Sequence, residues 1–268
     1  MPARLNLRVA SVRVASKCVA GVVLSALLAG CSGTSAAAGS SGAGVSTAVE
    51  TGTTATPSVT TPATKPAPTP TAARAGSRVS AADQRAGLRS TKVPWSAGGR
   101  IVVVPGRSAA PGKARRTYTV RVEVESGLDV DRVAFAKFVM ATLNDKRSWT
   151  ENGKRRFART DAATADIQVL LASPAKSASI CLPLHTFGKL SCRHGANTAV
   201  LTYYRWVKAI PEYASNHTGY REYVINHEVG HVLGHGHEYC AGKGALAPLM
   251  MQQTKGLKGC RPNPWPHP

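Results

Sequence analysis

The chain has 268 residues and carries 34 Lys and Arg against 14 Asp and Glu, a formal net charge of +20. Its length allows one or two domains. No apolar run approaches the roughly 20 residues that a membrane-spanning helix needs, which excludes a polytopic membrane protein. Residues beyond about position 100 have ordinary globular patterning, which excludes a wholly disordered chain. A balance this basic is common in nucleic-acid-binding proteins, so the other features have to test that class.

The first 30 residues predict export. Residues 1–17 carry four cations, and residues 18–30 are apolar or small. Such a run is too short to span a membrane and is typical of a signal peptide. It ends in Leu-Ala-Gly-Cys31, which resembles the lipobox of bacterial lipoproteins. That resemblance implies cleavage before Cys31, a lipid on its thiol, and a protein anchored to the outer face of the cell membrane or shed from it. The alternative is an ordinary secretory signal that happens to contain a cysteine.

The segment after Cys31 is predicted to be a disordered linker. Of the 43 residues at 31–73, 37 are Ser, Thr, Ala, Gly or Pro. Such a stretch has too little apolar surface to offset the entropy of ordering it. Residues 74–94 are also polar and basic. We therefore predict a linker over 31–94 and a folded domain over 95–268, which is long enough for one core.

The first half of this domain shows a strand, a helix and a second strand. Residues 117–125 alternate Val with charged or hydroxyl residues, which predicts a half-buried strand. Residues 129–144 have apolar side chains at helical spacing and predict an amphipathic helix with Asp129 or Asp131 near its N-cap. Residues 155–159 predict a short strand.

The second half continues the alternation. Residues 165–172 are more continuously apolar, as expected of a central strand. Residues 198–207 predict a further strand, and residues 219–233 predict a helix. This order of elements predicts an α/β fold in which helices pack on a twisted sheet.

The last predicted helix carries a pattern typical of a catalytic metal site. Residues four apart on a helix share one face, so His227 and His231 can present two imidazoles to one ion. Glu228 follows the first histidine and can reach a water on the metal without being a ligand. Gly234 can take the left-handed conformation that ends a helix, and the chain can then bring back His237 as third ligand. Three protein ligands with a fourth position open describe catalytic zinc.

This pattern resembles the zinc-binding consensus of the metzincin clan of metalloendopeptidases. More narrowly, the chain is similar to a family of secreted metzincin-like proteins of high-GC Gram-positive bacteria. The resemblance implies a zincin-like fold: a twisted, mostly parallel sheet with an antiparallel edge strand above the cleft, a backing helix, the active-site helix and a small C-terminal subdomain. It also implies a Met-turn whose methionine lies under the metal, with Met250 as our prediction and Met251 as the alternative.

The resemblance implies a zinc-dependent endopeptidase that acts on a protein or peptide substrate. Glu228 would be the general base that takes a proton from zinc-activated water and passes it to the leaving amine. Two alternatives stay open. One is a catalytically idle zinc-binding lipoprotein that binds the cell wall or a partner, and the other is a zinc amidase acting on peptidoglycan peptides.

Several other residues have two interpretations. His235 is the alternative to His237 as third ligand, although it follows Gly234 too closely. We expect His185, His194 and His217 to be exposed loop residues. The aromatic residues at 203, 204 and 206 fit packing better than a cleft edge. Glu238 is expected at the surface.

Four cysteines remain in the predicted domain, and three pairings are possible. An exported protein favours disulfides over thiols. The pairs Cys181–Cys192 and Cys240–Cys260 each close a short loop, so we predict these two. A structural zinc site of four cysteines is the weaker alternative, because no C-x-x-C spacing occurs.

The opening charge can now be divided. The predicted domain holds 24 Lys and Arg against 12 Asp and Glu, which leaves +12. It has no basic helix, zinc finger or aromatic stacking motif, and we expect no nucleic-acid partner. A basic surface outside a cell membrane fits anionic lipid head groups and anionic wall polymers better. We expect a monomer.

Overall fold

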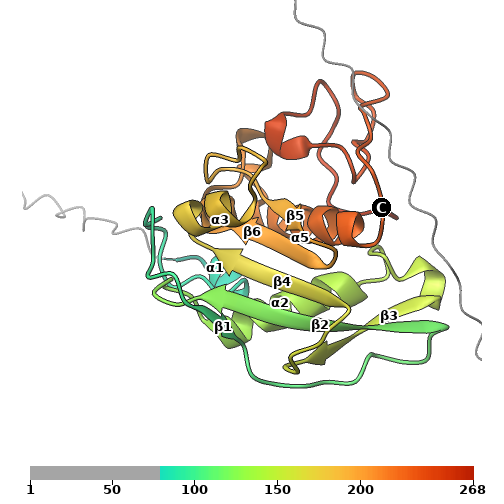
Figure 1. Cartoon of the computed structure of the whole chain (residues 1–268). Helices are drawn as coiled ribbons and strands as arrows, with labels where there is room; N and C mark the ends of the chain where they lie inside the picture. The colour runs from blue at the N-terminus through green and yellow to red at the C-terminus, as the bar shows by residue number, and fades with distance from the viewer. Residues whose placement is uncertain (1–78) are drawn as a thin grey trace, which may run out of the picture. The chain divides into compact units, whose positions relative to one another are not determined.

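The computed structural model describes residues 79–268, and the predicted signal peptide, the predicted lipidation site Cys31 and most of the predicted linker lie outside these residues. The described part is a mixed α/β fold with one open sheet (Figure 1). Its helices are α1 Ala81–Arg85, α2 Arg132–Asn144, α3 Pro174–Ile180, α4 Tyr203–Lys208 and α5 His217–Val232. Its strands are β1 Ile101–Val103, β2 Arg116–Glu125, β3 Arg155–Thr160, β4 Ile167–Ala172, β5 Cys192–His194 and β6 Thr198–Thr202. Short 3-10 turns lie at Glu151–Gly153, Pro211–Tyr213 and Gln253–Lys255.

The sheet is mostly parallel, as the resemblance implied. Its order is β1-β2-β4-β6-β5, with β3 also paired to β2. Strands β3, β2, β4 and β6 run parallel, whereas β1 and β5 are antiparallel to their neighbours. The prediction named one antiparallel edge strand, and the described part has an antiparallel strand on each side of the sheet. Strand β5 is the one beside the site described below.

Alternation along the strands separates two faces of the sheet. Val169 and Leu171 of β4 belong to the main core with residues of α2 and α5. Leu170 faces the other way and packs with Val200 and the Cys181–Cys192 disulfide near α3. The main core therefore lies between the sheet and the two long helices, and a smaller cluster lies on the opposite face.

Residues before Trp95 also belong to the folded part, so the predicted domain boundary is too late. Ser80 caps α1 by accepting a hydrogen bond from the Asp83 amide, and the Asp83 carboxylate accepts in return from the Ser80 amide. Ala86 and Leu88 are buried in the main core. The polar sequence of this segment concealed its packing, because its partners lie far away in the chain.

The predicted strand at 198–207 is wrong in its second half. Strand β6 ends at Thr202, and Tyr203–Lys208 form helix α4. Tyr203, Trp206 and Val207 are its buried residues, an i, i+3, i+4 spacing that indicates a helix. Both aromatic residues belong to the core, as expected from the sequence.

The residues after α5 contain little regular structure. A small cluster of Ala247, Met251, Leu257 and the Cys240–Cys260 disulfide holds them together. Both predicted disulfides are therefore confirmed, and they indicate an exported or extracellular protein. Over residues 79–268, none of the helices has both the length and the apolar character needed to cross a membrane.

Candidate metal centre

Helix α5 begins and ends at residues that suit its two ends. The Asn216 side chain accepts a hydrogen bond from the Gly219 amide at the N-terminus. At the other end, Gly234 has φ +96°, its amide donates to His231 O, and the His235 amide donates to Gly230 O. This is a Schellman motif, so Gly234 ends the helix as its position in the sequence predicted.

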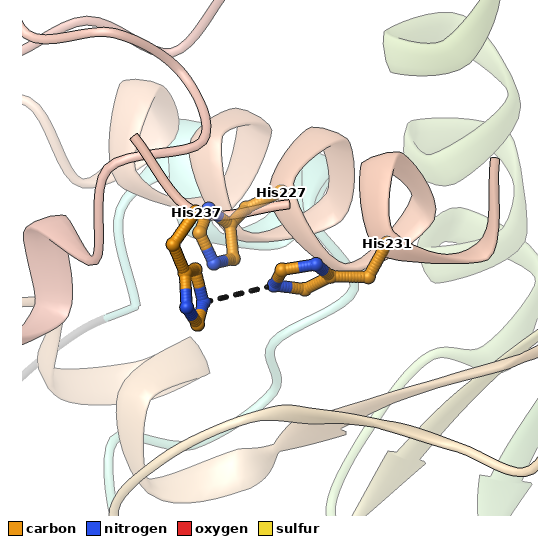
Figure 2. A group of neighbouring side chains, drawn as sticks. All are labelled: His227, His231 and His237. Carbon is orange, nitrogen blue, oxygen red and sulfur yellow. Dashed lines mark hydrogen bonds between the residues drawn. The ribbon is translucent and has the colours of Figure 1, made fainter. Parts of the chain in front are cut away.

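The reversal at Gly234 brings three imidazoles together. His227 and His231 project from α5, and His237 returns toward them from the following segment (Figure 2). One nitrogen from each of the three rings lies within 4.8 Å of the others, and His231 Nε2 is 3.1 Å from His237 Nε2. We call these three residues the histidine triad. They form a group that could hold a metal ion.

Backbone carbonyls fix the orientation of two of these rings. His227 Nδ1 lies 3.0 Å from Leu249 O, and His231 Nδ1 lies 2.9 Å from His235 O. A carbonyl oxygen can only accept, so each Nδ1 carries the proton and donates it. The Nε2 lone pair of each ring is therefore free toward the triad, which is the arrangement that supports metal-ligating histidines.

The pKa of each triad imidazole lies below its ordinary value. Burial is the largest cause at His227, where it lowers the pKa to about 3. Burial also comes first at His231 and His237, with added repulsion from the nearby cations Arg193 and Lys255, respectively. The triad is therefore neutral near pH 7, which is the form of imidazole that binds metals.

Glu228 lies beside the triad and is 5% exposed. Burial raises the pKa of its carboxyl group to about 8. Its side chain lines the same cleft as His227 and His237. With this pKa the carboxyl group is largely protonated at pH 7 in the metal-free protein, and it is its position beside the triad that suits a general base.

The cleft consists of two adjoining hollows of about 190 and 240 Å³, which share His227, Glu228 and His237 as lining residues. The lining includes residues of β5 and of the loop before it, together with residues from the segment 252–255. Arg193 lines one hollow and Lys255 lines the other, and Glu228 is the only carboxylate in the lining of either. Sequence reasoning missed both cations, because only the fold places them beside the triad.

Of the two candidate Met-turn residues, Met250 is the one in contact with α5. A Cβ atom added to Gly230 would lie 2.5 Å from Met250 Sδ, so the thioether packs directly on the helix between His227 and His231. Met251 instead packs in the C-terminal cluster. The backbone here also supports the site through the contact of Leu249 O with His227.

His235 is directed away from the triad. Its ring stacks on Trp149, with the ring centroids 4.2 Å apart. Trp149 Nε1 donates to Asn226 O at 2.8 Å, next to the first triad residue. Nothing in the sequence pattern pointed to Trp149, because it lies 77 residues before its partner.

The other histidines and Glu238 lie in varied places. His185 is exposed in a loop, as expected, and lines the cleft. His194 lies on β5 rather than in a loop, and His217 is the first residue of α5. Glu238 is exposed, in agreement with the sequence interpretation.

Fold and site together define a mixed α/β domain with a candidate three-histidine metal centre in an open cleft. The chain belongs to the DUF3152 family, described as a protein family of unknown function, whose model matches residues 88–268. No curated protein and no solved structure matches the chain.

Proposed function

We propose that this protein is a zinc-dependent endopeptidase with Glu228 as its general base. The observation that carries the proposal is the histidine triad beside a buried carboxylate in an open cleft. The metzincin-like identity of the fold is part of the proposal. It is supported by the mostly parallel sheet, the antiparallel strand β5 along the cleft and the site on the long helix α5.

The donor set fits zinc. Three neutral imidazoles are a common ligand set for catalytic zinc, which keeps its fourth position open. Zinc–nitrogen bonds of 2.0–2.1 Å in a tetrahedral site place ligand nitrogens about 3.3 Å apart. The Nε2 atoms of His231 and His237 are 3.1 Å apart, which is close to that value.

When bound, zinc acts as a Lewis acid that activates water and polarises a carbonyl group. Glu228 accepts a proton from the water that attacks the peptide carbonyl, and it then donates this proton to the leaving amine. His227 and His231 are held by Leu249 O and His235 O, so the rings need no reorientation during the reaction.

The cleft suits an extended polypeptide. Strand β5 is the last strand on its side of the described sheet, and its Arg193 lines the cleft. The free side of such a strand can pair with an extended chain by main-chain hydrogen bonds. This is why we favour a protein or peptide substrate over a small amide.

The proposal includes a lipid anchor on Cys31, which would tether the exported domain to the outer face of the cell membrane. It predicts that Cys31→Ser converts a membrane-bound protein into a released one. Fractionation of cells that express either form measures this. Equal membrane retention of both forms would count against the lipid anchor.

The first test of catalysis compares Glu228→Gln with the matched control Glu238→Gln, which changes an exposed carboxylate one residue after His237. We expect Glu228→Gln to keep its zinc and to lose 10²–10⁴-fold in kcat on an unfolded protein. The control should cleave like the wild type, and a chelator should abolish cleavage. Zinc content is measured by elemental analysis.

Three outcomes separate the alternatives. Zinc binding with equal behaviour of Glu228→Gln and wild type would indicate an idle zinc-binding protein. Cleavage of peptidoglycan peptides but of no protein would indicate an amidase. Absence of stoichiometric zinc in protein purified without chelator and supplied with the metal would remove the basis of the proposal and of both alternatives.

A further inference from the structure

The Cys181–Cys192 loop, residues 182–191, exposes three large apolar side chains. Leu182 is 57% exposed, Leu184 is 59% exposed and Phe187 is 74% exposed. Across residues 79–268 only eight large hydrophobic residues are exposed, and three of them fall within residues 182–187. Such a concentration marks an interaction surface, whereas single exposed apolar residues are ordinary.

The loop is held in place at its base. The Cys181–Cys192 disulfide closes it, with the two Cα atoms 6.0 Å apart. Thr202 Oγ1 donates to Gly188 O at 2.6 Å, and Arg205 Nε donates to Lys189 O at 3.1 Å. The apolar side chains are therefore presented by a fixed loop.

The stretch of chain that contains the loop carries side-chain charge of one sign. Residues 167–211 contain five Lys and Arg and no Asp or Glu. Lys189 Nζ lies 6.0 Å from the centre of the Tyr204 ring, and the Arg205 guanidinium lies 5.2 Å from it. Lys208 follows Tyr204 by one helical turn of α4 and is exposed. An apolar loop is thus bordered by cations and a tyrosine.

We propose that the Cys181–Cys192 loop is a membrane-docking surface, with Leu182 and Phe187 entering an anionic lipid bilayer and Lys189 and Lys208 meeting its head groups. Apolar side chains that enter the acyl boundary, with Lys and Arg beside them, are the composition of interfacial anchors. Basic residues near an anionic leaflet add attraction that depends on salt. The absence of any carboxylate over these 45 residues favours a surface of uniform negative charge over a protein partner.

Docking in this way has a consequence for the cleft. Leu184 belongs to the loop and also lines both hollows beside the triad. The cleft therefore opens next to the proposed membrane contact. This consequence rests on the proposed function, and it would direct cleavage to polypeptides at the membrane surface.

The test is vesicle flotation of the full chain, with Cys31→Ser in every arm so that no acyl group contributes. Vesicles of equal parts phosphatidylglycerol and phosphatidylcholine are compared with pure phosphatidylcholine. We expect binding to the anionic vesicles, at least tenfold weaker for Leu182→Ser/Phe187→Ser and about fivefold weaker for Lys189→Gln. Neither Leu182 nor Phe187 lines the cleft.

Matched controls come from other exposed positions. Val133→Ser changes an apolar residue that is 52% exposed on α2, and Lys113→Gln changes an exposed cation between β1 and β2. Both should bind like the parent. A Phe187→Trp variant should show a blue-shifted emission with anionic vesicles and quenching by brominated acyl chains. Melting temperatures show that each variant is folded.

The readout needs no catalysis, so failure here leaves the proposed function untouched. Absence of binding to anionic vesicles, or equal binding by the double variant, would overturn the proposal. So would a double variant that binds vesicles normally but cleaves a soluble protein more slowly, because the loop would then be a contact for protein substrate.

Discussion

The two halves of helix α5 bury polar side chains equally well but use them differently. In the first half, Arg221 is fully buried, and its guanidinium donates to Trp206 O and to Asp83. In the second half, Glu228 is only 5% exposed, yet its side chain lines an open cleft beside the triad. Burial alone therefore does not identify a functional residue. The presence of internal partners distinguishes a structural polar group from one that is left to meet a ligand.

The tyrosines of α5 illustrate the structural half. Tyr220 shares a hydrogen bond with Thr254 Oγ1 at 2.9 Å, and Tyr223 OH donates to Met251 O at 3.0 Å. Burial raises the pKa of both phenols, which keeps them neutral. These contacts join the helix to residues 251–254, and part of this segment lines the cleft. The first half of α5 thus positions the second half.

The largest expected effect is the disruption of the histidine triad. His237→Ala removes one triad nitrogen, whereas His235→Ala removes a neighbouring imidazole that stacks on Trp149. Loss of residues that merely support ligands already lowers metal affinity 10–100-fold. We therefore expect His237→Ala to weaken zinc binding more than 100-fold and His235→Ala to weaken it less than tenfold. Competition with a chromogenic chelator measures both, and a reversed order would show that His235 is the third ligand.

The next largest effect is expected from loss of the Arg221–Asp83 ion pair in the first half of α5. Asp83→Ala leaves Arg221, whose side chain is 1% exposed, without its carboxylate partner. Removing one member of a buried pair costs about 3 kcal/mol or more. We expect a loss of about 3 kcal/mol in the free energy of unfolding, measured by urea denaturation. Arg89→Ala breaks an exposed pair with Asp131 and should cost at most about 1 kcal/mol. Equal losses would mean that the Arg221 pair has no structural role.

The pH dependence of the same pair sharpens this prediction. Burial would raise the pKa of Asp83, but hydrogen bonds from Ser80 and Arg221 and the Arg221 charge outweigh it, so the pKa is lowered. A lowered pKa in the fold stabilises the protein above the unfolded value of about 3.9, and this contribution is lost as the pH falls through the folded value. The difference between wild type and Asp83→Ala should be constant from pH 7 to 5 and shrink below about pH 4. A difference that stays constant to pH 2 would contradict this.

Much of the sheet and both long helices could be predicted from sequence. Strand β2 and helix α2 follow from side-chain periodicity, although β2 is buried on both faces from Val122 to Glu125 rather than half-buried throughout. Helix α5 has no such apolar stripe, and its position came from the spacing of its histidines. The same spacing predicted which three rings meet, since helix geometry and a terminal glycine fix that arrangement locally.

What the sequence did not reveal depends on contacts between distant segments. Helix α1 is polar, so its sequence predicts a linker, yet Asp83 contacts Arg221, which lies 138 residues later in the chain. The sequence predicts a strand where helix α4 forms, because the aromatic residues there also favour strands. Arg193 and Lys255 reach the cleft from two separate segments, and neither belongs to a recognisable motif.

The smallest expected effect is at Gly230, which lies between the triad residues His227 and His231 on α5. A Cβ at Gly230 would lie 2.5 Å from Met250 Sδ and 2.7 Å from Trp149 Cζ2. Met250 is flexible, but the Trp149 ring is fixed by its hydrogen bond to Asn226 O. Overpacking of this kind costs 1–3 kcal/mol, and better helix propensity of alanine offsets up to about 1 kcal/mol.

Gly230→Ala should therefore lower the free energy of unfolding by about 1–2 kcal/mol. It should also weaken zinc binding severalfold, because displacing Met250 also moves Leu249 O, which holds His227. Gly236→Ala is the matched control, since a Cβ there meets nothing within 4 Å although it directly precedes His237. Urea denaturation and zinc competition on both variants separate the two effects. If Gly230→Ala lost stability but kept full zinc affinity, the packing of Met250 under α5 would support the fold alone and would not be needed to position the triad.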